Sequence, residues 1–155
     1  MQRWISGKID DTNIFPSDPV GTSFSPLPQQ QQQGAAAAGD DDDDWIGKRS
    51  GFPKDFVGIC RTVFLQMFRV YAHLYWDHFL NPFYHLSLEK QLNSCFSHFI
   101  LTATTLDLLR PEDIEPMRPL VDMWAADGTL PPESKAYGFA DLKQGKEIME
   151  LSPAA

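Results

Sequence analysis

A long run of apolar residues at helical spacing, within residues 53–79, constrains the fold of this chain more than any other feature. One set repeats at steps of four and three: Phe56, Cys60, Val63, Met67, Val70 and Leu74. A second set repeats that spacing on an adjacent face: Phe64, Phe68, Tyr71 and Tyr75. Both sets match the period of an α-helix. A helix that is apolar over most of its circumference needs other helices around it, so this run predicts the central helix of an all-α bundle. Pro53 suits the first helical position.

The residues after the central helix predict a second helix. Asn81-Pro82 indicates a turn, after which Ser87 is placed to cap a helix that carries Glu89 in its first turn. The predicted apolar stripe of this helix is Leu88, Leu92, Cys95, Phe99, Ala103 and Leu106.

Prolines and glycines divide the remainder of the chain. Pro116 and Pro119 limit a helix near residues 110–113 to one turn, before another helix that runs to about Ala126 and stops at Gly128. Residues 129–155 predict an irregular tail with one short helix, which Gly145 would weaken.

The composition changes sharply at residues 25–50, which contain runs of glutamine, alanine and aspartate. Such a low-complexity segment buries too little surface to offset its ordering entropy, so we expect a disordered insertion. It separates a loop-like segment, residues 1–24, from a helical core at residues 51–128. The aspartate run fits a solvated, self-repelling loop, or else a docking patch for a basic partner.

Charge and cysteine content narrow the function classes. The formal net charge is −8, and no basic stripe for nucleic acid is present. An acidic surface suits a basic protein partner better. Cys60 and Cys95 occupy apolar positions and form no CxxC pair, which predicts buried, reduced thiols in the cytosol or nucleus. No apolar run approaches the ~20 residues of a membrane span.

Several short sequence motifs resemble motifs of a known family and occur in the same order along the chain. Residues 52–56 read Phe-Pro-Lys-Asp-Phe, and residues 68–79 run from Phe-Arg-Val-Tyr-Ala-His to Asp-His-Phe. Both motifs, and the segments at residues 92–99 and 109–117, resemble segments of the Mob/phocein proteins. These proteins are all-α adaptors that activate NDR/LATS-type AGC protein kinases. The resemblance implies a non-catalytic coactivator that binds the kinase's N-terminal regulatory region, in the cytoplasm and nucleus.

Two finer features of the resemblance bear on the branch of the family. Some Mob proteins bind phosphopeptides through a basic cluster on the central helix, but this chain has Leu65, Gln66 and Arg69 there. One arginine cannot make the several contacts of a phosphate site. The chain therefore lacks this basic cluster. In this respect, and in residues 83–86 and 124–128, it resembles the fungal branch of the family that co-activates NDR-type kinases in cell polarity and morphogenesis. The alternative is a phocein-like scaffold adaptor in phosphatase-kinase assemblies.

The resemblance also implies a partner-binding set, Leu86, Ser87 and His98, at family positions that contact the kinase. Taken alone, His98 on a Phe-rich helix would be a buried core histidine. Cys95 and His98 lie three residues apart but have no orienting third group, so they do not indicate a catalytic thiol.

His73 and His78 match two zinc ligands of the family, which two earlier cysteines complete. A closed zinc site needs four ligands, and no cysteine precedes the central helix in this chain. We therefore expect His73 to bond to Asp77 one turn later and His78 to cap the helix end, with no cofactor. The family also places helices before its counterpart of residues 4–17, so we expect the chain to begin within a Mob domain.

Overall fold

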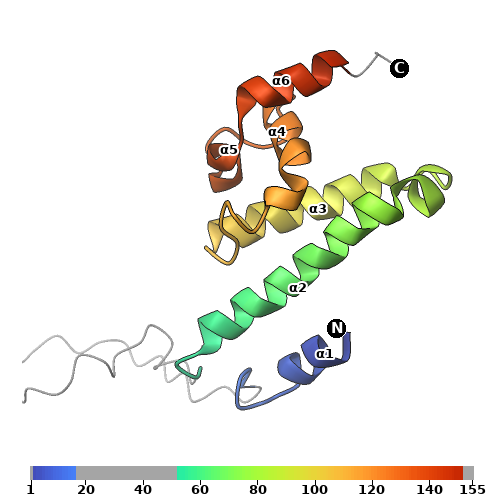
Figure 1. The fold of residues 1–155 in the computed structure, drawn as a ribbon. Helices are drawn as coiled ribbons and strands as arrows, with labels where there is room; N and C mark the ends of the chain where they lie inside the picture. The colour runs from blue at the N-terminus through green and yellow to red at the C-terminus, as the bar shows by residue number, and fades with distance from the viewer. Residues whose placement is uncertain (1, 17–51, 152–155) are drawn as a thin grey trace, which may run out of the picture. The chain divides into compact units, whose positions relative to one another are not determined.

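A computed structural model describes residues 2–16 and 52–151, and within those residues every regular element is a helix (Figure 1). The predicted all-α fold is therefore confirmed. The predicted insertion at residues 25–50 lies outside the described residues. The contacts divide the chain into two units, one up to Ile59 and one from Cys60 onward. None of the described helices is long and apolar enough to cross a membrane.

The first unit contains a helix that the sequence analysis did not predict. Helix α1 spans Gln2–Ile9, in a segment expected to be loop-like. A turn follows, in which the Asp11 side chain accepts a hydrogen bond from the backbone N–H of Asn13 at 3.0 Å. Lys8 at the end of α1 lies 6.0 Å from the Trp4 ring, an interaction between side chains one turn apart that periodicity alone does not reveal.

Aromatic side chains from both sides of the undescribed stretch meet at the start of the central helix. The Phe56 ring lies 5.2 Å from the Phe15 ring and 4.2 Å from the Phe52 ring. Helix α2 begins at Phe56 and ends at Asp77. The expected start at Pro53 was wrong by three residues, because Pro53 opens a turn in which its carbonyl accepts from the Phe56 N–H at 3.0 Å.

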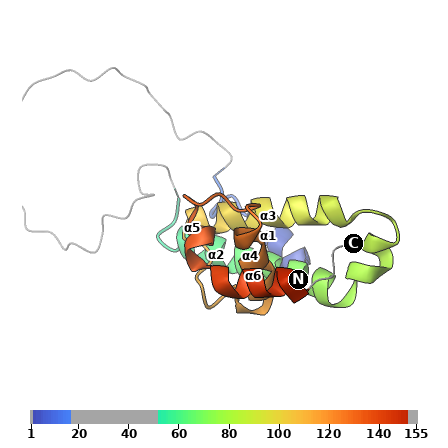
Figure 2. The ribbon, with the colours of Figure 1, turned by 90° about the horizontal axis from the view of Figure 1, so that it is seen from above.

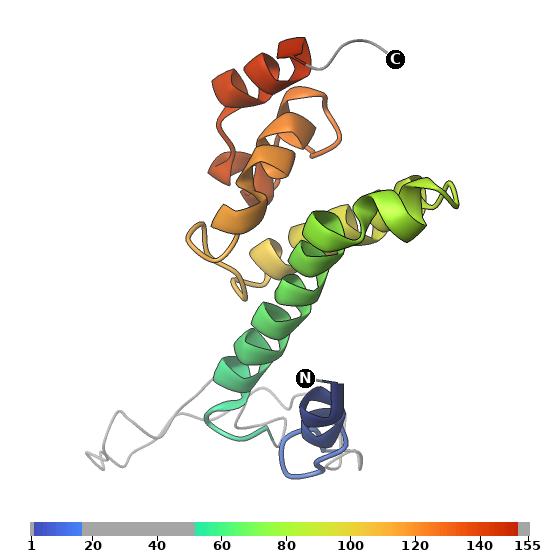
Figure 3. The ribbon, with the colours of Figure 1, turned by 45° about the vertical axis from the view of Figure 1, so that its right-hand side comes forward.

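In the second unit, α2 packs on α3, which spans Glu89–Thr105, through a layer of aromatic rings. Phe96 is fully buried and contacts Phe68, Tyr71 and Tyr75 at centroid distances of 6.2, 5.1 and 5.3 Å. Phe64 stacks on Phe99 at 5.5 Å. Figure 3 shows α3 running back beside α2. The second of the two predicted apolar faces is therefore the one that forms this interface.

The first predicted face of α2 is only partly covered. Val63 is buried, but Met67 and Val70 are exposed. The expectation that other helices cover most of the circumference is therefore not met along this face. Burying exposed side chains of this size would be worth about 1.5–3 kcal/mol each.

The turn between α2 and α3 corrects the predicted helix cap. A π-type turn, η2, spans Phe79–Tyr84 and contains Asn81 in a non-helical conformation. Ser87 has a left-handed φ of 54°, and Leu88 holds the cap position without a side-chain hydrogen bond. Ser87 therefore does not cap α3. The prediction that Glu89 lies in the first turn is correct.

The buried face of α3 is rotated from the predicted stripe. Leu92, Phe99 and Ala103 are buried as expected, whereas Cys95 is exposed. Leu88 and Leu106 are exposed as well. The center of the face is instead formed by Phe96 and Ile100, because the aromatic residues of α2 select the face of α3 that offers the largest rings.

Helix α4 follows the predicted proline and glycine signals. A short 3₁₀ helix, η3, spans Glu115–Met117, and α4 spans Arg118–Ala126 with Pro119 in its first turn. Gly128 has a φ of 84°, which terminates the helix as predicted. Trp124 of α4 lies against the Phe96 ring at 5.7 Å and so joins α4 to the aromatic layer.

The expected irregular tail contains two helices. Helix α5 spans Lys135–Phe139, and α6 spans Leu142–Leu151 and lies beside α4 (Figures 1 and 2). Gly145 is buried at the contact, and a Cβ added there would stand 2.1 Å from the Asp122 carbonyl oxygen. Gly145 was predicted to weaken the helix, but its missing side chain allows α6 to approach α4.

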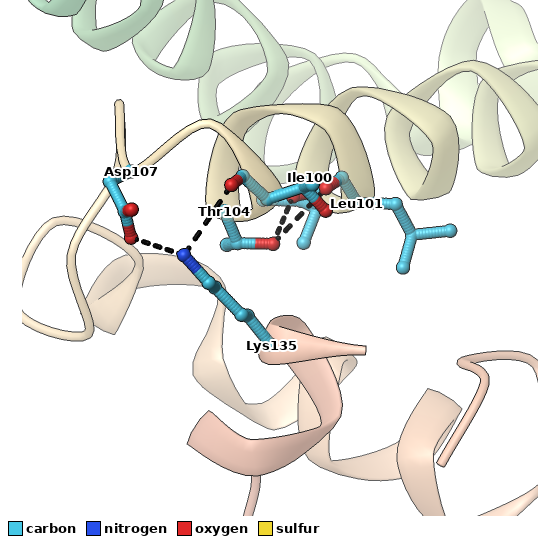
Figure 4. Close-up of polar contacts among 6 residues, drawn as sticks. Ile100, Leu101, Thr104, Asp107 and Lys135 are labelled. Atoms are coloured by element: carbon cyan, nitrogen blue, oxygen red, sulfur yellow. Dashed lines mark hydrogen bonds and ion pairs between the residues drawn. The ribbon is translucent and has the colours of Figure 1, made fainter. Parts of the chain in front are cut away.

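A polar contact ties α5 to the end of α3 (Figure 4). The Lys135 ammonium group lies 2.7 Å from Asp107 Oδ1 and donates to the Thr105 carbonyl at 3.4 Å. Beside it, the Thr104 hydroxyl donates to the Ile100 carbonyl at 2.8 Å, within the helix. A cation next to the last carbonyls of a helix is favoured by the helix dipole.

Candidate functional site

The loop between α2 and α3 presents apolar side chains to solvent on a hydrogen-bonded backbone. Leu80, Tyr84 and Leu86 are 69, 60 and 63% exposed. The N–H groups of Leu86, Ser87 and Leu88 donate to the carbonyls of Pro82, Tyr84 and Phe83 at 2.9, 3.0 and 2.8 Å. Because the backbone is held this way, the loop offers its apolar side chains in a defined arrangement to a partner.

His98 lies on the solvent-facing side of α3 and not in the core. The side chain is exposed, which overturns the interpretation of His98 as a buried histidine. Gln91, Ser94 and His98 follow each other at steps of three and four, so they form one exposed line along the helix. Ser87 is exposed just before the start of this line. All three predicted partner-binding residues are exposed: Leu86 and Ser87 in the loop before α3, and His98 on this line of the helix.

Leu80 and Tyr84 are exposed in the same loop as Leu86 and Ser87, although the sequence analysis did not select them. The available signal was their place beside Asn81-Pro82, because a turn cannot bury large apolar side chains as a helix face does. Exposed apolar residues grouped on a firm backbone are typical of a protein interaction site.

Neither cysteine has a hydrogen-bonded base among the described residues. Burial raises the pKa of the Cys60 thiol, which disfavours its thiolate form. Cys95 is exposed, contrary to the expectation of a buried thiol, but no hydrogen bond among the described residues joins it to His98. A general base would have to be hydrogen-bonded to the thiol.

The two histidines at the end of α2 meet each other. His73 Nε2 and His78 Nε2 are 3.2 Å apart, and the ring planes are nearly perpendicular, at 89°. On its other side, His73 Nδ1 lies 2.6 Å from Asp77 Oδ2, as predicted. His78 directly follows the last residue of α2, as predicted, and its N–H donates to the Leu74 carbonyl at 3.1 Å, while its ring turns to His73.

This histidine pair matches half of a zinc site and no more. A histidine that bonds a carboxylate through one nitrogen has the arrangement of a metal ligand. However, Cys60 precedes His73 by thirteen residues of the same helix, about 20 Å along its axis. The described residues contain no group of three or more His, Cys, Asp or Glu side chains that could hold a metal ion. The part of the chain that the structure describes does not complete a tetrahedral zinc site.

Comparison with protein-family models identifies the family. Residues 35–117 match the model of the Mob1/phocein family, more than half of the chain. The chain belongs to the Mob1/phocein family. This match confirms the resemblance, since all four segments that carry it lie inside the matched range: residues 52–56, 68–79, 92–99 and 109–117.

Curated Mob proteins from several kingdoms are similar to this chain. It is 30% identical over 132 residues to the "CBK1 kinase activator protein MOB2" of Candida albicans, covering 85% of this chain and 33% of that protein. It is 32% identical over 122 residues to the "DBF2 kinase activator protein MOB1" of Saccharomyces cerevisiae, covering 78% and 29%. It is 37% identical over 124 residues to the "MOB kinase activator-like 1A" of Arabidopsis thaliana, covering 79% and 43%.

These relatives are much longer than the region they share with this Mob1/phocein chain. The chain spans about a third of the length of the two fungal relatives. No solved structure matches the chain significantly.

Proposed function

We propose that this Mob1/phocein chain is a non-catalytic coactivator that binds the N-terminal regulatory region of an NDR/LATS-type AGC protein kinase. The relatives named as kinase activators support this proposal. The observation that carries it is the exposed surface around Leu86, Ser87 and His98. The family resemblance implies that these residues contact the kinase, and the exposure of all three supports that role.

The charge of the chain supports a basic partner segment. The net charge is −8, which attracts a basic segment and speeds its association. The exposed side chains of Leu80, Tyr84 and Leu86 would supply the apolar contact area, with the imidazole of His98 as a polar contact. Binding that orders the regulatory region would favour the active kinase conformation.

The role is regulatory and not catalytic in this proposal. The relatives are named as activators of kinases, which supports a regulatory role. We further propose that the protein acts in cell polarity and morphogenesis signalling, in the cytoplasm and nucleus.

A binding experiment tests the proposal directly. The full chain would be titrated with the N-terminal regulatory segment of an NDR-type kinase and, separately, with purified phosphatase scaffold proteins. We expect binding of the kinase segment, and a weakening of about tenfold for Leu86→Ala and for His98→Ala, the size expected for an interface hot spot.

Glu133→Ala provides the matched control, because Glu133 is exposed and lies outside this surface. It should bind as the unaltered chain does. Binding of the phosphatase scaffold in place of the kinase segment would favour a phocein-like adaptor instead. Equal binding by all four proteins would remove the surface from the proposal.

A further inference from the structure

A second surface of the molecule is an apolar groove where the end of α2 meets α3 and the start of α4. Its volume is about 400 Å³, within the range of pockets that hold ligands. Trp76 and Phe79 line one side, and Leu120 and Met123 line the other. None of the described residues that line the groove is charged. Because a charged group would meet no counter-charge there, the groove favours an uncharged occupant.

Aromatic rings at the end of α2 form one wall of the groove. The Tyr75 ring stacks on the Phe79 ring at a centroid distance of 5.7 Å, with the ring planes 15° apart. Trp76 lies between them in the sequence and is 73% exposed. Grooves lined by aromatic side chains are typical of sites that bind proline-rich segments in the polyproline II conformation.

The polar atoms of the groove include two groups that can donate hydrogen bonds to an occupant. Asn93 Oδ1 accepts the hydrogen of the Tyr75 hydroxyl at 2.7 Å, and this contact orients the Asn93 amide. No hydrogen bond among the described residues uses the NH₂ group of Asn93 or the indole N–H of Trp76. Both of these groups donate and do not accept. An occupant with free carbonyl oxygens would therefore find donors in an otherwise apolar groove.

The backbone conformation of the occupant follows from these donors. An α-helix uses its carbonyl oxygens for its own N–H groups, so its backbone would leave the two donors unmatched. An extended strand brings N–H groups as well as carbonyls, and Asn93 Oδ1 is already engaged by Tyr75. A polyproline II segment has no internal hydrogen bonds, and its prolines carry carbonyls without N–H groups. It therefore matches an uncharged, aromatic groove with free donors better than a helix or a strand does.

We propose that this groove binds an uncharged, proline-rich segment of a protein partner, whose apolar side chains pack on Tyr75 and Trp76 and whose backbone carbonyls accept from Asn93 and the Trp76 indole. The groove is separate from the predicted kinase-contacting residues, because Asn93 and His98 are five residues apart and point about 140° away from each other on α3. The proposal does not depend on the proposed function, since the groove can be occupied with or without a kinase.

A peptide titration with the full chain tests the proposal. The probe is an uncharged, fluorescently labelled peptide of prolines with leucine at every third position, which places the leucines along one edge of a polyproline II helix. The comparison peptide carries alanine in place of each proline and favours an α-helix instead. We expect the full chain to raise the fluorescence anisotropy of the proline-rich peptide and to bind the alanine peptide about tenfold more weakly.

Three variants measure the contributions of the aromatic wall and of the donors. Trp76→Ala removes both a ring and a donor and should weaken binding of the proline-rich peptide about tenfold. Trp76→Phe keeps a ring and should weaken it about threefold. Asn93→Asp keeps the acceptor for the Tyr75 hydroxyl but removes the NH₂ group, so it should weaken binding several-fold. Leu86→Ala is the matched control, because Leu86 is exposed and does not line the groove, and it should leave binding unchanged. Circular dichroism checks that each variant is folded.

The outcomes separate this proposal from the proposed function. If the folded chain does not bind the proline-rich peptide, or binds it no better than the alanine peptide, the groove proposal is overturned, even where a kinase segment binds in a Leu86-dependent way. Binding that Trp76→Ala leaves unchanged would place the peptide elsewhere and overturn it as well. Self-association of the chain in sedimentation, abolished by Trp76→Ala, would show a second copy in the groove and also overturn the proposal.

Discussion

The two helix pairs of the second unit are joined in opposite ways. Between α2 and α3, aromatic rings fill the space, with Phe96 in contact with four other rings of the pair at 5.1–6.4 Å. Between α4 and α6, a glycine replaces the side chain, and a Cβ at Gly145 would meet the Asp122 carbonyl at 2.1 Å. The first interface depends on side-chain volume and the second on its absence, so equal changes in volume should have opposite consequences.

The largest expected effect is the loss of volume at the aromatic interface. Phe96→Ala should lower the free energy of unfolding by about 3–5 kcal/mol, because the side chain is fully buried and a cavity would remain. Urea unfolding monitored by circular dichroism measures the change. Tyr84→Ala is the control, since Tyr84 is 60% exposed and should change stability little. A loss below about 1 kcal/mol for Phe96→Ala would show that the aromatic layer is not a rigid core.

A gain of volume at the α4–α6 contact should also destabilise the protein. Gly145→Ala should cost about 1–3 kcal/mol through overpacking against Asp122, although alanine is the better helix former by about 1 kcal/mol. Gly138→Ala in α5 is the matched control, because no atom lies within 4 Å of the added Cβ, and it should be neutral or stabilising. Equal effects of the two substitutions in urea unfolding would contradict the close approach of α6 to α4.

The difference between the α2–α3 and α4–α6 interfaces explains which parts of the fold could be predicted from the sequence. Large apolar residues at helical spacing identified α2 and α3, and Pro119 and Gly128 located the ends of α4. A glycine in a helix can indicate a weak point of that helix or a close approach of another helix. Which of the two applies depends on the neighbouring helix, whose position the sequence alone does not show. The sequence analysis considered only the first of these two possibilities for Gly145, and the close contact with α4 was found only in the structure.

The candidate site was predictable to a similar extent. Family positions selected Leu86, Ser87 and His98, whereas the Phe-rich helix taken alone would have placed His98 in the core. Apolar residues lie on more than one side of this helix, so the sequence does not show which side the partner helix covers. The same ambiguity put Cys95 in the predicted stripe, whereas Phe96 holds the buried position. The meeting of His73 and His78 depends on where α2 ends, which helical spacing alone does not specify.

The aromatic interface should also make the stability depend on alkaline pH. Burial raises the pKa of Tyr71 and of Tyr75 above 10, so the folded state holds these protons more firmly than the unfolded state. Stability is therefore complete below about pH 10 and falls as the pH rises, because the unfolded state loses its tyrosine protons first. Tyr75→Phe should make this decline shallower. At neutral pH the same variant should cost about 0.5–1.5 kcal/mol through the lost hydrogen bond to Asn93. A decline of unchanged steepness in urea unfolding at pH 9–11 would contradict the assignment to Tyr75.

The smallest expected effect lies at the contact between α5 and the end of α3. Lys135 and Asp107 are 2.7 Å apart, but the two side chains are 48 and 80% exposed, so solvent screens the attraction. Lys135→Met keeps most of the aliphatic stem and should lower the free energy of unfolding by about 0.2–1 kcal/mol, including the loss of the contact with the Thr105 carbonyl. Because salt screens exposed charges, the difference between Lys135→Met and the unaltered chain should shrink in 1 M salt. Lys143→Met on α6 is the control, since Lys143 lies 4.0 Å from Glu147 and is 88% exposed. A loss above about 2 kcal/mol for Lys135→Met would mean that α5 is held on α3 mainly by charge, and that this second unit contains a third kind of helix contact.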